Sequence, residues 1–241
     1  MGFLSGIVSG IGAAVSGIAA KVMPVIAGVT SKIGGALKGF ADKFIAGVSS
    51  LGLSEEKITE TVKSVGNIVH LVAGMQGIES ESDPAVLGAK AGKAEKSIDD
   101  FDNKAEDYIS YLKNDVKLDT EKFEKLSSMD KTAWSVIGIT LEVKAVEDRI
   151  GKISISPESL SLLASLIAAG ITVEPGKLLN VVISLKNAGV KDMSDVSDYF
   201  TGKGDSDRMQ TGDALRTALG EDADEKICRF KEAVRSTDNE A

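Results

Sequence analysis

The first fifty residues constrain most strongly what this chain can fold into, because they are rich in glycine and almost free of acidic side chains. They hold ten of the 25 glycines, a single aspartate and no glutamate, and residues 1–20 carry no charged side chain. Each glycine costs about 0.8–1 kcal/mol relative to alanine in an exposed helix. A helix in this segment is therefore unstable alone and needs cover from a membrane, from sister subunits or from the rest of the chain.

Large apolar residues recur through this segment at steps of three and four, which places them on one face of a helix. This row consists of Phe3, Ile7, Ile11, Val15, Ile18, Val22, Val25 and Val29. A second stripe holds only small residues, namely Gly2, Gly6, Gly10 and Ala14. Small residues spaced by four let helix backbones approach closely, and in lipid they favour helix association. The two stripes predict that this segment serves membrane insertion or helix packing.

The length and charge of the segment indicate conditional insertion into a bilayer. About 20 apolar residues cross a bilayer core, and residues 3–20 are long enough but rich in glycine and serine, which insert less favourably than leucine. Residues 1–50 carry a net charge of +3 and residues 51–241 a net charge of −11. A basic apolar segment is attracted to anionic lipid head groups, whereas an acidic body argues against general nucleic-acid binding. We expect a lipid bilayer and further copies of this chain as partners.

The composition offers little material for catalysis. His70 and Cys228 are the only residues of their types, so one chain can form neither a disulfide nor the usual Cys/His zinc site. The acidic residues between positions 205 and 225 do not follow the calcium-loop pattern. We therefore expect a protein that is not an enzyme and that has no cofactor and no metal site. His70 is a candidate pH sensor, because imidazole changes its charge between pH 5 and 8; the alternative is a structural histidine.

The middle of the chain predicts helices that pair through apolar faces. Ser54 is a helix N-cap, followed by an inward-facing row at heptad spacing. Residues 77–92 contain glycines and an Asp-Pro pair and predict a loop that acts as a hinge. A second helix is expected over residues 93–114, and Asp130 is expected to cap a third that ends near Ile150. Residues 51–152 therefore predict a central antiparallel helical bundle or hairpin.

The last third predicts shorter helices. Pro157 and Gly170 bound one of them, and Pro175 and Gly189 bound the next. Three further helices are expected at residues 194–200, 211–219 and 221–234, so residues 153–241 form a compact domain of short helices. The expected fold class is all-α, with residues 1–50 as a separate membrane-active or oligomerisation segment.

The run from Gly6 to Ile18 and the run from Ile33 to Phe40 carry a resemblance. This Gly/Ser/Ile-rich texture resembles the apolar helices of phage tail tape-measure proteins and ejected virion proteins. It is also similar to membrane-penetrating peptides of non-enveloped viruses and to helical pore-forming toxins. The resemblance covers residues 2–50 and implies a virion-associated or secreted protein that acts at a target membrane.

These observations lead to two functional hypotheses. In the first, the chain is a membrane-active helical protein of a virion or injection machine that oligomerises and inserts its N-terminal helices into a target bilayer. In the second, it is a structural oligomer whose N-terminal helices pack around a symmetry axis without contacting lipid. A further arrangement is open from the sequence. The N-terminal helix can fold back onto the bundle of residues 54–150, since the apolar faces of both would be covered that way.

Overall fold

The computed structural model describes residue 18 and residues 20–151, 153–202 and 208–239. These residues form helices joined by short connections, and they contain no strand beyond one isolated parallel bridge between Ser154 and Asp192. The all-α prediction is confirmed. Residue 18 and residues 20–28 are helical, and the later elements are α2 (Thr30–Ser49), α3 (Glu55–Met75), α4 (Pro84–Lys93), a 3₁₀ turn (Ile98–Phe101), α5 (Ala105–Asp115), α6 (Thr120–Glu124), α7 (Ser128–Ile150), α8 (Pro157–Ala168), α9 (Pro175–Asn187), α10 (Ser194–Thr201), α11 (Arg208–Leu219) and α12 (Ala223–Asn239).

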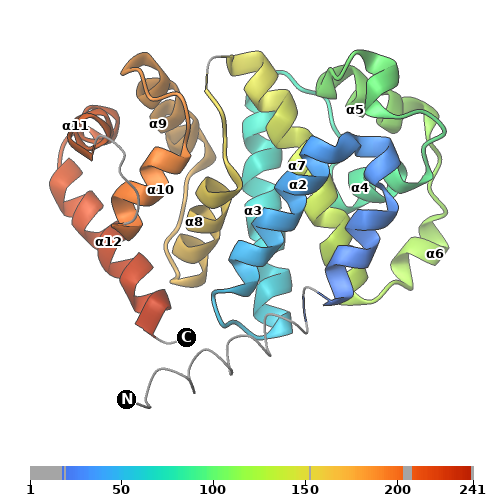
Figure 1. Cartoon of the computed structure of the whole chain (residues 1–241), viewed down its shortest axis with the longest axis horizontal. Helices are drawn as coiled ribbons and strands as arrows, with labels where there is room; N and C mark the ends of the chain where they lie inside the picture. The colour runs from blue at the N-terminus through green and yellow to red at the C-terminus, as the bar shows by residue number, and fades with distance from the viewer. Residues whose placement is uncertain (1–17, 19, 152, 203–207, 240–241) are drawn as a thin grey trace.

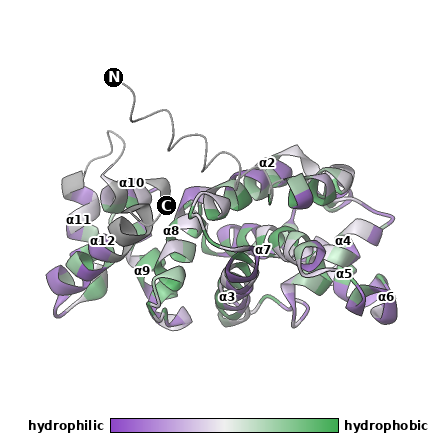
Figure 2. Ribbon diagram, turned by 90° about the horizontal axis from the view of Figure 1, so that it is seen from below, coloured by the Kyte–Doolittle hydropathy of each residue, from purple (hydrophilic) through white to green (hydrophobic). Residues whose placement is uncertain are grey.

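The helices are arranged along one long axis (Figure 1). Helices α3 and α7 lie in the middle, α4 to α6 lie at one end and α8 to α12 lie at the other. Seen from below, α2 forms a second layer over α3 and α7, and the hydrophobic residues concentrate where the layers meet (Figure 2). Helix α2 contacts α7 and α8, and so it covers both the middle and the beginning of the C-terminal group.

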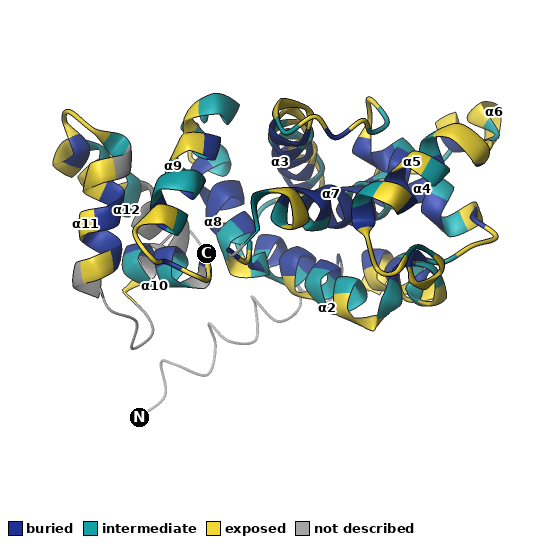
Figure 3. Ribbon diagram, turned by 90° about the horizontal axis from the view of Figure 1, so that it is seen from above, coloured by how far each residue is buried: buried dark blue, intermediate teal, exposed yellow. Residues whose placement is uncertain are grey.

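Helix α7 is enclosed by its neighbours on all sides (Figure 3). Every residue from 136 to 143 is buried, and the helix contacts α2, α3, α4 and α5. A helix that is apolar all round belongs in the interior of a domain. Its hydroxyl groups are satisfied locally, since Thr140 Oγ1 donates to the Val136 carbonyl at 2.8 Å and Thr132 Oγ1 donates to the Ser128 carbonyl at 2.8 Å.

The described part of the N-terminal segment packs into the same core as α3 and α7. Gly34 interrupts the helix with φ 79° and ψ 160°, a conformation that only glycine adopts without strain. On both sides of this kink apolar side chains face the interior. The buried residues are Ile18, Val22, Ile26, Val29, Ile33, Ala41, Phe44, Ile45 and Val48.

Two N-caps were expected from the sequence, and the structure confirms one and moves the other. Ser54 caps α3 by accepting from the Lys57 amide, and the apolar row of this helix is buried as expected. Helix α7 begins earlier than predicted, because Ser127 caps it by accepting from the Asp130 amide at 3.1 Å. Asp130 instead accepts from the Ser127 hydroxyl at 2.7 Å, so its carboxylate holds the capping side chain in place.

The predicted hinge over residues 77–92 is wrong, because α4 occupies its second half. The Asp83 carboxylate accepts from the Ala85 amide at 2.8 Å, and Pro84 takes the first helical position, where a missing N–H costs nothing. Gly88 and Gly92 are therefore part of a helix and do not form turns. They lie on the α4 surface that contacts Trp134 of α7.

The helix predicted over residues 93–114 is interrupted. A 3₁₀ turn at residues 98–101 is followed by Asp102 and Asn103 with φ of 54° and 58°, and α5 begins only at Ala105. Aspartate and asparagine tolerate this left-handed backbone better than most residues. The apolar positions of the predicted helix are nevertheless buried, since Ile98, Tyr108 and Leu112 are each no more than 2 % exposed.

The C-terminal helices form a second core. This core includes Leu166, Val182, Leu185, Phe200 and Leu215, among other residues. Helices α8 and α9 begin at the predicted prolines and end before the predicted glycines. Gly170 and Gly189 adopt φ of 77° and 91°, and the next amides, of Ile171 and Val190, donate back to the Leu166 and Leu185 carbonyls. This is the hydrogen bond of a glycine C-cap.

Helices α4 and α7 approach so closely that two glycines are required at the contact. A Cβ atom added to Gly138 would lie 1.9 Å from the Pro84 carbonyl oxygen, and one added to Gly88 would lie 2.0 Å from the Trp134 carbonyl oxygen. Both obstacles are backbone atoms of the facing helix, which cannot turn aside as a side chain can. The α4–α7 contact therefore depends on the absence of side chains at these two positions.

We expect Gly138→Ala to lower the free energy of unfolding by about 1–3 kcal/mol or more, because α4 and α7 must move apart. Gly39→Ala on α2 is the matched control, since no heavy atom lies within 4 Å of its added Cβ. There, alanine should raise stability by up to about 1 kcal/mol. Urea unfolding followed by circular dichroism measures both. Equal stability of Gly138→Ala and the wild type would contradict the close contact.

Candidate functional site

The residues predicted to serve membrane insertion or helix packing are only partly described. Phe3, Gly6, Ile7, Gly10, Ile11, Ala14 and Val15 lie outside the described residues. Ile18 and Val22 are buried in the body of the protein, whereas Val25 is half-buried and Ile26 takes the interior position. The row of buried residues therefore continues from Val22 to Ile26, a step of four positions.

Three lysines of the N-terminal segment have partners within the protein, two of them in the body. Lys21 forms an ion pair with Glu55 at the start of α3, and Lys38 pairs with Asp42 one turn along α2. Lys32 Nζ donates to the Glu95 carbonyl at 2.9 Å. Among the described residues, no helix combines the length and the apolar character that crossing a membrane requires.

A buried acid and the only histidine meet between α3 and α7. His70 Nδ1 lies 2.9 Å from Glu142 Oε1, and the exposed fractions of their side chains are 28 % and 0 %. His70 is one position after the inward-facing Val69 on α3, and Glu142 lies within the fully buried stretch of α7. Both side chains therefore lie where α3 and α7 are in contact. The pair therefore joins the two central helices through one polar contact.

The carboxylate of Glu142 is incompletely satisfied. Burial raises the pKa of Glu142, while the hydrogen bond from His70 and the nearby Ser80 side chain partly oppose this rise. Glu142 Oε2 and Ser80 Oγ are both buried, and neither has a partner within hydrogen-bonding geometry. Ser80 therefore contributes less than His70 to stabilising the charged carboxylate. An uncompensated buried oxygen of this kind costs free energy in the folded state.

The arrangement around His70 does not form a hydrolytic triad. In a triad the imidazole bridges an acid and a nucleophile, whereas the Ser80 hydroxyl has no hydrogen bond to His70. Within the described part of the chain, no group of three or more His, Cys, Asp or Glu residues is placed to hold a metal ion. Cys228 is exposed on α12.

Sequence reasoning found His70 but missed Glu142. A signal for it does exist, because residues 132–141 contain no charged side chain and Glu142 ends this apolar stretch. A lone acid in an apolar helix indicates a buried carboxylate with a partner. That the partner is His70, 72 positions earlier in the chain, depends on tertiary packing.

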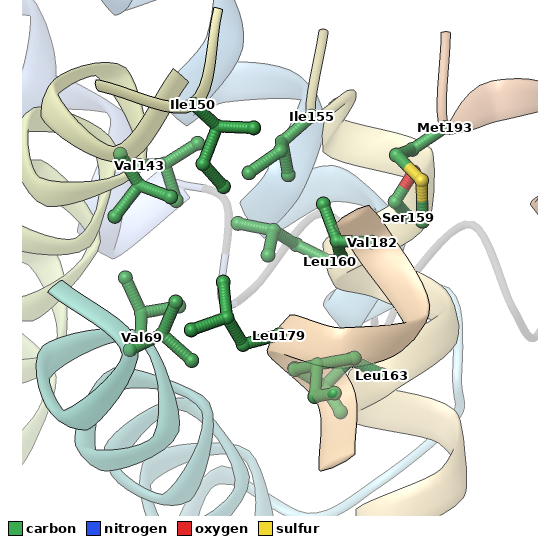
Figure 4. A pocket seen from close by; sticks show the side chains of 13 residues that line it. Val69, Val143, Ile150, Ile155, Ser159, Leu160, Leu163, Leu179, Val182 and Met193 are labelled. Carbon is green, nitrogen blue, oxygen red and sulfur yellow. The ribbon is translucent and has the colours of Figure 1, made fainter. Parts of the chain in front are cut away.

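An apolar cavity of about 80 Å³ lies beside this pair, among α3, α7, α8 and α9. Val69 and Val143, which line it, are the immediate neighbours of His70 and Glu142 in the sequence. Figure 4 shows their side chains, with those of Leu160 and Leu179, around a common space. The full lining consists of Val69, Val72, Val143, Val146, Ile150, Ile155, Ser159, Leu160, Leu163, Leu178, Leu179, Val182 and Met193.

Comparison of the chain with protein-family models, with curated proteins and with solved structures found no match. The functional proposals below therefore rest on the residues of this chain alone.

The raised pKa of Glu142 predicts a specific pH dependence of stability. The folded state holds the Glu142 proton more tightly than the unfolded state, in which the pKa is near 4.5. The free energy of unfolding therefore falls as the pH rises from that value through the folded pKa, and the loss is complete above it. Glu142→Gln cannot ionise. We expect its stability relative to the wild type to rise as the pH increases above about 4.5.

Urea unfolding of both proteins across this range measures the difference. Glu79→Gln is the matched control, because the Glu79 side chain is 88 % exposed and carries no comparable burial penalty. Its stability relative to the wild type should change little with pH. A difference between Glu142→Gln and the wild type that does not depend on pH would contradict the raised pKa.

Proposed function

We propose that this protein is a membrane-active helical protein, carried by a virion or an injection machine, whose N-terminal apolar segment enters a target bilayer. The proposal rests on the regular spacing of apolar residues, which continues from the buried residues of the body into the residues that precede Ile18 in the sequence. Ile18 and Val22 are buried in the body, and the same three-and-four spacing continues backward through Val15, Ile11 and Ile7. The residues before Ile18 carry no charged side chain, and their number reaches the lower end of the length that a bilayer core requires, about 17 residues.

The folded body limits which residues are available for insertion. Residues from Val22 onward supply core side chains such as Ile26, Ile33 and Phe44, so withdrawing them into lipid would dismantle the interior. Because Ile18 is buried as well, the inserting element is confined to the residues before it, which is the lower end of the length that crosses a bilayer core, about 17 residues. This is shorter than the 50-residue segment expected from composition.

The contacts of the lysines modify the expected role of lipid charge. Lys21, Lys32 and Lys38 each have a partner within the protein, so their attraction to anionic head groups is reduced. The apolar row is then the main source of bilayer affinity. We expect binding to neutral vesicles as well as to anionic ones.

A structural oligomer is the second candidate, and one observation favours it. Helices α4 and α7 already pack backbone against backbone at Gly88 and Gly138 without lipid. The stripe at Gly6 and Gly10 has the same spacing of four as Gly88 and Gly92. The N-terminal helices of several copies would then pack around a symmetry axis through this stripe.

Substituting Ile11→Lys in the full-length chain tests insertion. Replacing isoleucine with lysine at the centre of an inserted helix costs roughly 3 kcal/mol, so the vesicle partition coefficient should fall about a hundredfold. Flotation with neutral and anionic vesicles measures it. Leu71→Lys is the matched control, because Leu71 is 51 % exposed on α3; it makes the same change of charge on the body and should leave flotation unchanged.

Flotation and oligomer size, measured on the same protein samples, distinguish the two candidate functions. Absence of flotation by the folded wild type in every vesicle would exclude insertion. A wild-type oligomer that dissociates in the double variant Gly6→Leu/Gly10→Leu, as measured by light scattering, would then support the structural candidate. An unchanged oligomer size would remove the role proposed for the small-residue stripe.

A further inference from the structure

The apolar cavity lies where the two cores of the protein meet. Val69, Val143 and Leu179 belong to the core around α7, whereas Val182 and Met193 belong to the C-terminal core. Ile150, at the end of α7, packs against both cores. A group that fills this cavity would therefore contact both cores at once.

We propose that this cavity binds the end of an unbranched alkyl chain. An engineered cavity of about 150 Å³ lined by Leu, Ile and Phe stays dry and binds benzene or xenon. The present cavity has about 80 Å³, so it is too small for an aromatic ring but suits xenon or a few methylene groups. Its only polar lining residue is Ser159, whose hydroxyl lies 3.0 Å from the Ser156 hydroxyl. The lining thus offers dispersion contacts and little to hold water.

The side of the cavity at the α7–α8 connection carries an ammonium group and a carboxylate group. Four lining residues are half-buried, namely Ile150, Ile155, Ser159 and Leu178, and the first three lie at the α7–α8 connection. Lys186 Nζ donates to the Ile150 carbonyl at 2.7 Å, which places its ammonium group at the rim. The Glu147 carboxylate is also nearby, but it accepts from the Ile155 amide and the Ser154 hydroxyl. The ligand class is therefore a short alkyl carboxylate, with its chain in the cavity and its head group beside Lys186.

Binding would stabilise the protein by holding the two cores together. A ligand that binds only the folded state raises stability in proportion to the logarithm of its concentration above the dissociation constant. This site does not depend on the N-terminal segment. The variant Ile11→Lys should bind an alkyl carboxylate as the wild type does, so failure of one proposal leaves the other intact.

The test uses full-length protein with ¹³C-labelled Val and Leu methyl groups, and hexanoate and xenon as separate probes. Saturable shifts of the Val143 and Leu179 methyl signals are expected with both probes. The double variant Val143→Ile/Val182→Ile adds two methylene groups to the lining and should weaken binding of both about tenfold. Absence of saturable shifts in the wild type would overturn the proposal.

Two further variants make the test specific. Val136→Ile enlarges a fully buried valine of α7 outside the cavity; it should lower the melting temperature and leave probe binding unchanged, whereas Val143→Ile/Val182→Ile should not lower the melting temperature. Lys186→Met should weaken hexanoate binding and leave xenon binding unchanged. Equal hexanoate affinity of Lys186→Met and the wild type would overturn the carboxylate assignment.

The alkyl chain can come from a free carboxylate or from a membrane lipid, and flotation distinguishes the two. If the double cavity variant floats with phosphatidylcholine vesicles as the wild type does, the ligand is a free carboxylate. A loss of flotation confined to the cavity variant would assign the site to a lipid acyl chain.

Discussion

The close backbone contact between α4 and α7 is the constraint on which the rest of the structure depends. Two helices can meet backbone against backbone only where the residues at the contact have no side chain. Gly88 and Gly138 provide this approach, because their Cβ atoms would meet a carbonyl oxygen within 2.0 Å. Helix α3 can then pack on another face of α7 and bring His70 to Glu142.

The interface of α3 and α7 combines two opposite environments within a short distance. Consecutive residues on a helix point about 100° apart, so Glu142 meets His70 while Val143 faces the cavity. Burial raises the pKa of Glu142, and the cavity leaves lost dispersion contacts on the adjacent face. Both features lower stability, and a bound proton or a bound alkyl chain would relieve one or the other. The pH, through Glu142, and an apolar ligand, through the cavity, would therefore act on folding at the same interface.

The sequence predicted the elements that depend on local chemistry. Ser54, Pro157 and Gly170 mark helix ends through hydrogen bonds and dihedral angles that neighbouring residues determine. The sequence prediction failed where contacts with distant residues determine the structure. Gly88 was expected in a loop, but it lies on a helix against Trp134, and Glu142 is covered by α3 although most glutamates lie on the surface. The cavity requires four helices to meet, so no single stretch of sequence indicates it.

The N-terminal row connects the fold to the proposed function. Its described members Ile18 and Val22 contribute to the core, whereas Ile7 and Ile11 continue the spacing in a stretch without charge. The apolar period of the sequence therefore runs from the core into an uncharged stretch, as the proposed insertion requires. Lys21, paired with Glu55, falls at this transition, so the body can remain folded while the uncharged residues before it change partners. Under the proposed function, lipid and a second copy of the chain would compete for the same apolar face, and the relative strength of those two contacts would decide between insertion and assembly.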